Sequence, residues 1–182
     1  VLQGVGLSSL EDLVQKTRLE AGTLTKVLNS LIQEQRVIRL GDLDNDPTNA
    51  LFTTTDNWRH LSQKAAGEVD RYHEANPLRD GVPREELKSR LKLEAPLFSA
   101  TLKRLLEEGA LLLDKNLVKA PGHSVKLNEG QRTWLKPLLA RFTAAPFTPP
   151  PVSECIAAAG NELYRALLET GELMQVSSDV VF

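Results

Sequence analysis

The clearest pattern of apolar and polar positions lies in the middle of the chain, over residues 72–113. Pro77 and Gly81 interrupt the helix expected before them. Pro83 suits the first turn of a new helix, where a backbone N–H is not needed. The spacing of leucines then predicts a short helix over residues 84–91.

A second amphipathic helix is predicted from Pro96 onward. Its apolar residues recur every three or four positions, as on a helix with one buried face: Phe98, Leu102, Leu105 and Leu106. Gly109 follows, where a left-handed residue commonly ends a helix, and residues 110–113 are typical of a strand. This order of two helices, a glycine and a strand indicates a helix-turn-helix with a β-wing.

The same pattern occurs in two other places. A shift of 74 positions places Leu13 on Leu87, Leu24 on Phe98, Leu28 on Leu102, Leu31 on Leu105 and Val37 on Leu111. A weaker downstream copy aligns Tyr164, Leu167, Gly171 and Leu173 with Leu102, Leu105, Gly109 and Leu111. Three copies of one unit predict a string of small domains rather than a single globule.

We therefore expect a mostly α (α+β) fold of three tandem winged-helix modules packed in a row, at residues 1–55, 56–124 and 125–182. Each module is near the lower size limit for an independent core, so neighbouring modules should pack on one another. The first module lacks the leading helix expected in the other two, and residue 1 is Val rather than Met. These two features favour a piece of a longer protein.

The remaining elements follow from the same patterns. In the first module we expect a helix after Ser8 or Ser9, a helix over residues 23–35, and strands over residues 37–40 and 50–54. The buried face of the helix over 23–35 should comprise Leu24, Val27, Leu28, Leu31 and Ile32. The second module should begin with a helix over about residues 56–75 and end with a strand over residues 117–120.

The third module should begin with a helix that carries an inward stripe of Trp134, Leu135, Leu138, Leu139 and Phe142. Pro137 should lie near its start or kink it. Paired helices over residues 152–159 and 161–170 and a hairpin over residues 173–182 should follow.

Composition excludes several classes of protein. The 182 residues carry a formal net charge of −2, with a sequence pI of about 6.0, so no overall basic charge indicates nucleic-acid binding. Cys155 is the single cysteine, which excludes an internal disulfide and suits a reducing cytosol. No apolar run reaches membrane-spanning length. We expect a cytoplasmic, monomeric protein without membrane contact.

No motif in the chain predicts catalysis or cofactor binding. A phosphate-binding glycine loop and a strand–GxGxxG–helix unit are both missing from the sequence. Cys155 occupies the inward position that Leu87 holds in the repeat, which favours a small buried side chain over a nucleophile. We therefore expect no catalytic residue, cofactor or metal ligand.

Two groups of side chains in the sequence are of the types that bind metal ions. His60, His73 and His123 lie far apart in the sequence without metal-ligand spacing, which favours surface or capping roles. Asp42, Asp44 and Asp46 alternate as in a calcium loop. The glycine and the later glutamate that such a loop requires are missing at the necessary offsets, so a solvated turn is the simpler interpretation.

Nucleic-acid binding by a helix-turn-helix depends on outward residues near the start of its second helix. These are Gly22, Thr23, Thr25, Lys26 and Asn29 in the first copy, Ala95, Leu97, Ser99, Ala100 and Lys103 in the second, and Asn161, Glu162, Arg165 and Ala166 in the third. None of the three sets is a basic cluster that could neutralise several phosphates. The second helices are therefore expected to act mainly in packing.

Positive charge gathers instead in residues 115–141, which carry a net +5, whereas residues 142–182 carry a net −4. The basic side chains are Lys115, Lys119, Lys126, Arg132, Lys136 and Arg141. They are the best candidates for contact with RNA or the ribosome. A solvated helix face with several lysines explains the same residues.

The stretch YHEANPLRDGVPREELKSRL, residues 72–91, resembles the bacterial selenocysteine-specific translation elongation factor family. Gly122 with His123, and the prolines at 149–151, resemble that family too, and the similarity covers most of the chain. Arg79 and Arg84 within the stretch are expected to be structural residues paired with nearby carboxylates rather than RNA ligands.

The resemblance implies an arm of four tandem winged helices that follows a GTPase and tRNA-binding part. It implies that GTP and magnesium are bound outside this chain, and that a fourth module, also outside it, chiefly reads a hairpin in selenoprotein messenger RNA. The expected role is non-catalytic: to link the part that carries selenocysteyl-tRNA to that hairpin on the ribosome, at an in-frame UGA codon. A DNA-binding transcriptional regulator and a protein-interaction scaffold are the alternatives.

Overall fold

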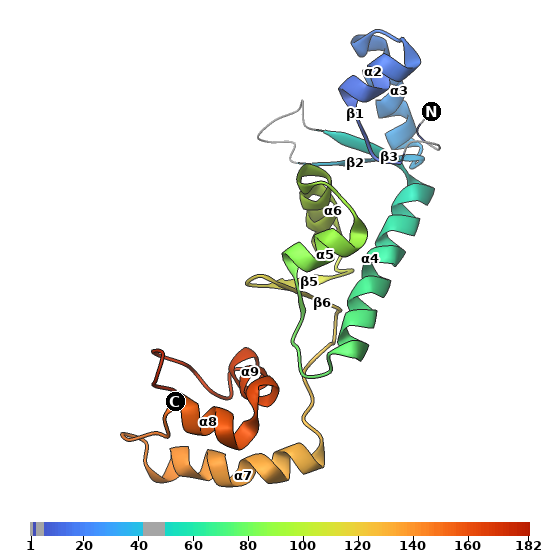
Figure 1. Ribbon diagram of the computed structural model, residues 1–182. Coiled ribbons are helices and arrows are strands. Elements are labelled where there is room, and N and C mark those ends of the chain that lie inside the picture. The colour runs from blue at the N-terminus through green and yellow to red at the C-terminus, as the bar shows by residue number, and fades with distance from the viewer. Residues whose placement is uncertain (1, 3–5, 42–49) are drawn as a thin grey trace. The chain divides into compact units, whose positions relative to one another are not determined.

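The computed structural model describes residues 2, 6–41 and 50–182, which cluster into two compact units (Figure 1). Unit 1 comprises Val1–Asp70 and Pro83–Pro121, and unit 2 comprises Arg71–Val82 and Gly122–Phe182. None of the helices in the described ranges is long and apolar enough to cross a membrane. Asp42, Asp44 and Asp46, with the turn and calcium-loop interpretations, lie outside the described residues.

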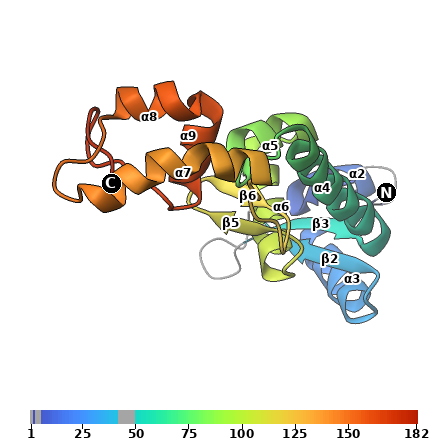
Figure 2. The same cartoon turned by 90° about the horizontal axis from the view of Figure 1, so that it is seen from below.

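Unit 1 begins with two helices and a small antiparallel sheet. The elements are β1 (Ser8–Ser9), α2 (Leu10–Thr17), α3 (Ala21–Gln33), β2 (Val37–Leu40) and β3 (Leu51–Thr54). The sheet order is β1-β3-β2, and the β2–β3 ribbon runs beside α3 (Figure 2). Strands β2 and β3 agree with prediction to within one residue, whereas the two-residue β1 is too short for a pattern to predict it.

Local signals explain the limits of α2. The Ser9 hydroxyl accepts a hydrogen bond from the Asp12 N–H at 3.1 Å, and the Asp12 carboxylate accepts one from the Ser9 N–H at 3.3 Å. This reciprocal capping box satisfies two N–H groups that have no partner within the helix. At the other end, Arg18 takes a left-handed conformation with φ of 57°.

The apolar face of α3 is more exposed to solvent than predicted. Leu24 and Leu28 are buried, but Val27 is 44% exposed, and Leu31 and Ile32 are only partly buried. The prediction for Val27 is wrong because an apolar stripe shows which side of a helix can be buried, not whether another element covers it.

Strand β3 continues without a loop into α4 (Thr55–Ala75). The junction is held because the Thr55 N–H and hydroxyl donate to the carbonyls of Arg36 and Gln35. Within unit 1, Trp58, Ala65 and Val69 form a buried face of α4, each at most 5% exposed. They give the predicted helix a buried apolar stripe that begins with an aromatic side chain.

Two further helices and a second three-stranded sheet follow α4. They are β4 (Val82–Pro83), α5 (Arg84–Leu91), α6 (Ala95–Glu107), β5 (Leu112–Asp114) and β6 (Leu117–Lys119), with sheet order β4-β6-β5. The helix limits agree with prediction to within one residue, and the predicted inward residues Phe98, Leu102 and Leu105 are at most 3% exposed. Burial of each such side chain stabilises the fold by about 1.5–3 kcal/mol.

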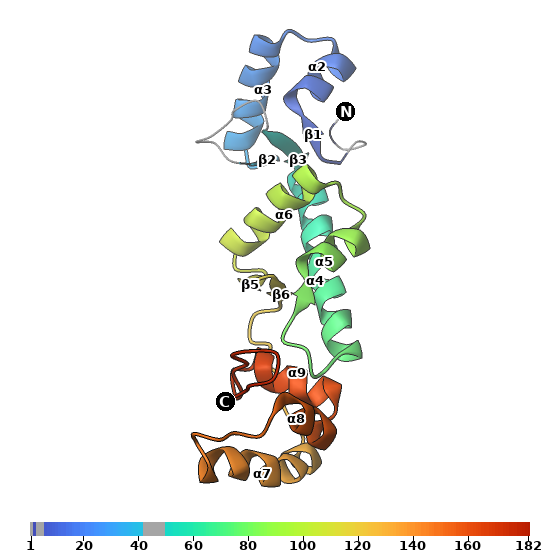
Figure 3. The same cartoon turned by 60° about the vertical axis from the view of Figure 1, so that its left-hand side comes forward.

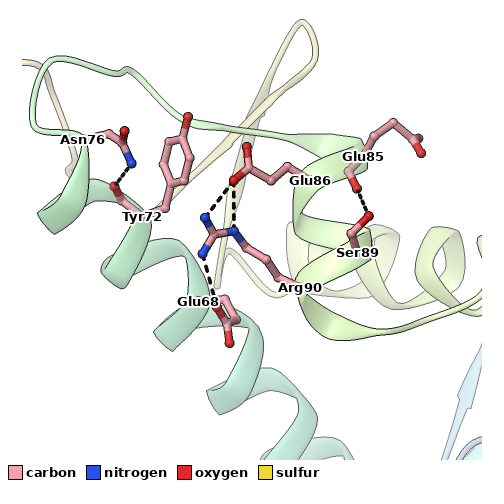
Figure 4. Close-up of polar contacts among 7 residues, drawn as sticks. All are labelled: Glu68, Tyr72, Asn76, Glu85, Glu86, Ser89 and Arg90. Atoms are coloured by element: carbon pink, nitrogen blue, oxygen red, sulfur yellow. Dashed lines mark hydrogen bonds and ion pairs between the residues drawn. The ribbon is translucent and has the colours of Figure 1, made fainter.

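Polar contacts hold α4 against both helices of this pair. Trp58 Nε1 donates to the Glu108 carboxylate at the end of α6, 3.1 Å from Oε2. Arg90 of α5 lies between Glu86 of its own helix, at 2.7 Å, and Glu68 of α4, at 3.8 Å (Figure 4). Helix α4 thus joins α5 and α6 as the third helix of this part of unit 1.

Unit 2 contains α7 (Glu129–Ala144), α8 (Val152–Ala159) and α9 (Asn161–Glu169), with α8 packed on α7 and α9 packed on α8 (Figure 3). Asn128 caps α7, and the helix continues through Pro137. Leu135 and Leu138 of α7 share one core with residues of α8 and α9.

Two predictions for the third repeat copy need correction. Trp134 is 58% exposed, because it lies at the edge of the stripe whose buried centre is Leu135 and Leu138. The predicted terminal hairpin forms isolated bridges, such as Gln175 with Val181, in place of strands. Met174 and Phe182 still exchange backbone hydrogen bonds, so the chain does reverse direction as expected.

Candidate nucleic-acid interface

The six predicted basic residues are divided between the two units. Lys115 and Lys119 belong to unit 1, and Lys126, Arg132, Lys136 and Arg141 belong to unit 2. Lys115 is exposed at the turn of the β5–β6 hairpin, where its φ is 54°. Lys119 lies 3.8 Å from Asp114 across the same hairpin, so part of its charge is balanced there.

In unit 2, helix α7 arranges the basic side chains. Arg132 and Lys136 are exposed and four positions apart, which places them on one side of the helix. Arg141 instead pairs with Glu154 at 2.6 Å and thereby joins α7 to α8. Arg132 and Lys136, with the exposed Lys126 before the helix, therefore form the cationic surface of this unit, here called the α7 basic face.

The second helices do not add a basic surface. Lys26, Lys103 and Arg165 are exposed, one on each of α3, α6 and α9. Ala166 was predicted to point outward but is 1% exposed, because α9 is buried on a wider face than its counterparts. Helix α6 also carries Arg104, but this side chain pairs with Glu108 at 2.6 Å. Each helix therefore offers one exposed cation and at most about one phosphate contact.

The family-like stretch is tied into unit 2 by Glu169 at the end of α9. Arg79 Nη1 donates to Glu169 Oε1 at 2.8 Å, and the Asp80 N–H donates to Glu169 Oε2 at 3.1 Å. One carboxylate thus holds both a side chain and the backbone of the turn that follows α4. The predicted structural pairing of Arg79 with a carboxylate is confirmed.

Arg84 has a different partner from the one predicted. Its Nη2 donates to the Ser99 hydroxyl at 3.2 Å, and its guanidinium lies 5.8 Å from the centre of the buried Phe98 ring. Among the described residues, the partners of this guanidinium are therefore a hydroxyl and an aromatic ring of α6 rather than a carboxylate. The expectation of an acidic partner was wrong because a planar cation also packs favourably on an aromatic face.

Two of the three histidines come together in unit 2. The rings of His73 and His123 stack with their centres 3.4 Å apart and an angle of 17° between their planes. His123 Nε2 also makes a 3.1 Å hydrogen bond with the Arg79 carbonyl oxygen. The expectation of separate surface histidines is therefore wrong for His73, which is 8% exposed, whereas His60 is exposed as expected.

Cys155 has the environment of a packing residue. Its side chain is fully buried in the core of unit 2, and this burial raises the pKa of the thiol. A raised pKa lowers the population of the nucleophilic thiolate. Among the described residues, no group of three or more His, Cys, Asp or Glu side chains could hold a metal ion.

Comparison with known proteins agrees with the resemblance seen in the sequence. Residues 67–119 match the family "Elongation factor SelB, winged helix". The whole chain is 25% identical, over 189 aligned residues, to the selenocysteine-specific elongation factor of Desulfomicrobium baculatum, and spans 29% of that protein's length. The predicted resemblance is thus confirmed: the whole chain is similar to a selenocysteine-specific elongation factor, and residues 67–119 match the SelB winged-helix family.

Proposed function

We propose that this chain belongs to the arm of a selenocysteine-specific elongation factor and that three tandem winged helices build it, at residues 1–55, 56–124 and 125–182. The observation that carries the proposal is the similarity of the whole chain to the curated relative. The first and third modules are inferred from the repeat. Leu13, Leu87 and Cys155 hold equivalent repeat positions, and each is at most 1% exposed.

The proposed role is non-catalytic. The arm links the part of the factor that binds GTP and selenocysteyl-tRNA to the part that reads a hairpin in selenoprotein messenger RNA on the ribosome. Two features support a spacer: β3 continues directly into α4, and Glu169 ties the turn after α4 to α9. Few exposed apolar or basic side chains lie on the outward faces of α6 and α9, which favours a spacer over a DNA-reading regulator.

Decoding of UGA tests the spacer role. In the full-length factor, residues 1–182 are replaced by a Gly/Ser linker of equal length. We expect binding of GTP and of the hairpin to persist. UGA decoding should fall by about tenfold or more, because a flexible linker no longer fixes the distance between the two sites. Unchanged decoding would overturn the proposal, and specific binding of duplex DNA would favour the regulator instead.

We also propose that the α7 basic face makes a weak, sequence-independent contact with RNA phosphates. Arg132 and Lys136 have no ion-pair partner in the part of the chain that the structure describes, so both charges are available. Two or three such contacts give a shallow dependence of affinity on salt. This contact supplements the hairpin recognition expected elsewhere in the factor.

A salt series tests this contact. The double variant Arg132→Ala/Lys136→Ala should reduce the slope of log affinity against log salt by about 2. The matched control, Lys16→Ala/Lys26→Ala, removes the same charge from exposed positions of α2 and α3 and should leave the slope nearly unchanged. Equal slopes for the two variants would mean that the RNA contact is not on α7.

A further inference from the structure

A stacked pair of histidines lies where two separate segments of the chain enter unit 2. These segments are Arg71–Val82 and Gly122–Phe182, and each carries one histidine of the pair near its start. The rings of His73 and His123 are nearly parallel, at 17°, with their centres 3.4 Å apart. His73 is 8% exposed and His123 is partly buried, so the stack is largely shielded from water.

The pair also holds the turn that follows α4. His123 Nε2 makes a 3.1 Å hydrogen bond with the Arg79 carbonyl oxygen. A carbonyl oxygen can only accept, so Nε2 carries a proton and donates it. Glu169 binds the same turn through Arg79 Nη1 and the Asp80 N–H. The stack therefore joins the end of α4, the turn after it and the segment that leads into α7.

The charged groups of these elements balance one added proton but not two. The turn carries the guanidinium of Arg79 and the buried carboxylate of Asp80, and α9 supplies the carboxylate of Glu169. These three groups sum to one negative charge. The Tyr72 ring lies edge-on to His73, with centres 6.4 Å apart, and adds no charge in its neutral form. The other charged residues on the joined segments are exposed: Arg71, Glu74 and Lys126.

One proton on the pair is compatible with the stack, whereas two are not. An imidazolium can lie on the face of a neutral ring, as cations do on aromatic faces. Because Nε2 of His123 already donates to Arg79, an added proton on that ring must go to Nδ1. Protonation of both rings would place two positive charges on ring centres 3.4 Å apart, with little water to screen them. Repulsion then favours separation of the rings.

We propose that His73 and His123 form a proton-operated clasp, which is closed when the pair carries at most one added proton and open when both rings are protonated. Opening releases the segment before α7 from the end of α4. The open form binds one more proton than the closed form, taken from solvent. Acidification therefore favours opening by up to about tenfold for each pH unit. Imidazole ordinarily changes charge between about pH 5 and 8, and the clasp needs no RNA contact to operate.

NMR of the 182-residue chain tests the clasp. A nuclear Overhauser effect between the two rings reports the stack, and the backbone order parameters of residues 122–126 report release of the segment. At about pH 7.5 the effect should be present, with order parameters of about 0.85. At about pH 5 the effect should be lost, and the order parameters should fall below about 0.6. The amides of α7 are the internal reference for folding and should stay rigid at both pH values.

Single substitutions show whether both histidines are required. His73→Phe and His123→Phe each keep an aromatic ring in the stack but leave the pair with at most one charge. Neither variant should respond to the change from about pH 7.5 to about pH 5, and because each is compared with itself, a lost hydrogen bond to Arg79 does not imitate the result. His60→Phe removes an exposed histidine of α4 and is the matched control, which should open as the unmodified chain does.

Three outcomes would overturn the proposal. A stack that persists in the unmodified chain at about pH 5 would mean that protons do not open it. If only one of the two Phe variants suppressed the response, a single histidine rather than the pair would be the sensor. A response that remains in both variants would assign it to other groups, such as Asp80 or Glu169.

Discussion

Glu169 offers the sharpest test of how the family-like stretch is held in unit 2. Its carboxylate accepts hydrogen bonds from Arg79 Nη1 and from the Asp80 N–H, at 2.8 and 3.1 Å. The Arg79 and Glu169 side chains are 34% and 21% exposed, so solvent screening limits the ion pair to about 0.5–1 kcal/mol. The hydrogen bond from a backbone N–H to a charged acceptor adds about 1.5–3 kcal/mol. Glu169→Ala should therefore lower the free energy of unfolding by about 2–3 kcal/mol.

Further variants separate the two contributions. Glu169→Gln keeps an acceptor for the Asp80 N–H but removes the charge, so it should cost about 1 kcal/mol. A double-mutant cycle with Arg79→Gln should give a coupling energy of about 0.5–1 kcal/mol. Urea denaturation followed by circular dichroism measures each free energy by linear extrapolation. Glu172→Ala, at an exposed neighbouring position, is the control and should change stability by less than about 0.5 kcal/mol.

Amide hydrogen exchange gives a direct readout at the contact. Exchange of the Asp80 N–H should accelerate by about tenfold in Glu169→Ala and much less in Glu169→Gln. The reasoning is refuted if Glu169→Ala is as stable as Glu172→Ala and leaves the exchange of the Asp80 N–H unchanged. The stretch over residues 77–82 would then be held by other contacts.

Three further predictions concern single side chains. Thr101 is fully buried and its hydroxyl makes no hydrogen bond within the described structure, so Thr101→Val should raise the free energy of unfolding by about 1 kcal/mol in urea; a loss would contradict this. Hydrogen bonds from the Ser9 hydroxyl and N–H lower the pKa of Asp12 in the folded state. Its stabilising effect is therefore complete above the ordinary carboxyl pKa and is lost as the pH falls through the folded value. In an NMR titration, Ser9→Ala should raise the pKa of Asp12 toward the ordinary value. Cys155 should react with a thiol reagent at pH 8 at least about tenfold slower in the folded protein than in urea, because burial raises its pKa and blocks access.

Local patterns predicted the helices well because their start and stop signals are themselves local. Pro83 before α5 and Pro151 before α8 mark helix starts, and the predicted limits of both helices match the structure. The exposure of Val27 and Trp134 could not be predicted in the same way. A hydrophobic stripe defines a direction on a helix, whereas burial depends on a partner that is distant in the sequence or outside the described chain.

The candidate interface was predictable as a region but not residue by residue. Net charge located the segment 115–141, and the structure then removed Arg141 from the available cations by pairing it with Glu154. The contact of Arg79 with Glu169 joins positions that are 90 residues apart, and no local pattern carries such information. Likewise, the stacking of His73 on His123 follows from how the end of α4 meets a later segment of the same unit.

Because no loop separates β3 from α4, the number of residues in α4 also determines the direction in which its buried face points. Each residue inserted between Thr55 and the buried face of α4 would advance that face by about 1.5 Å and turn it by about 100°. One added residue would thus point Ala65 and Val69 away from α5 and α6. Insertions of about 7 or 11 residues would nearly restore the phase while lengthening the helix. The spacing between the two sheets of unit 1 can therefore change only by insertions that return the buried face of α4 to the same side of the helix.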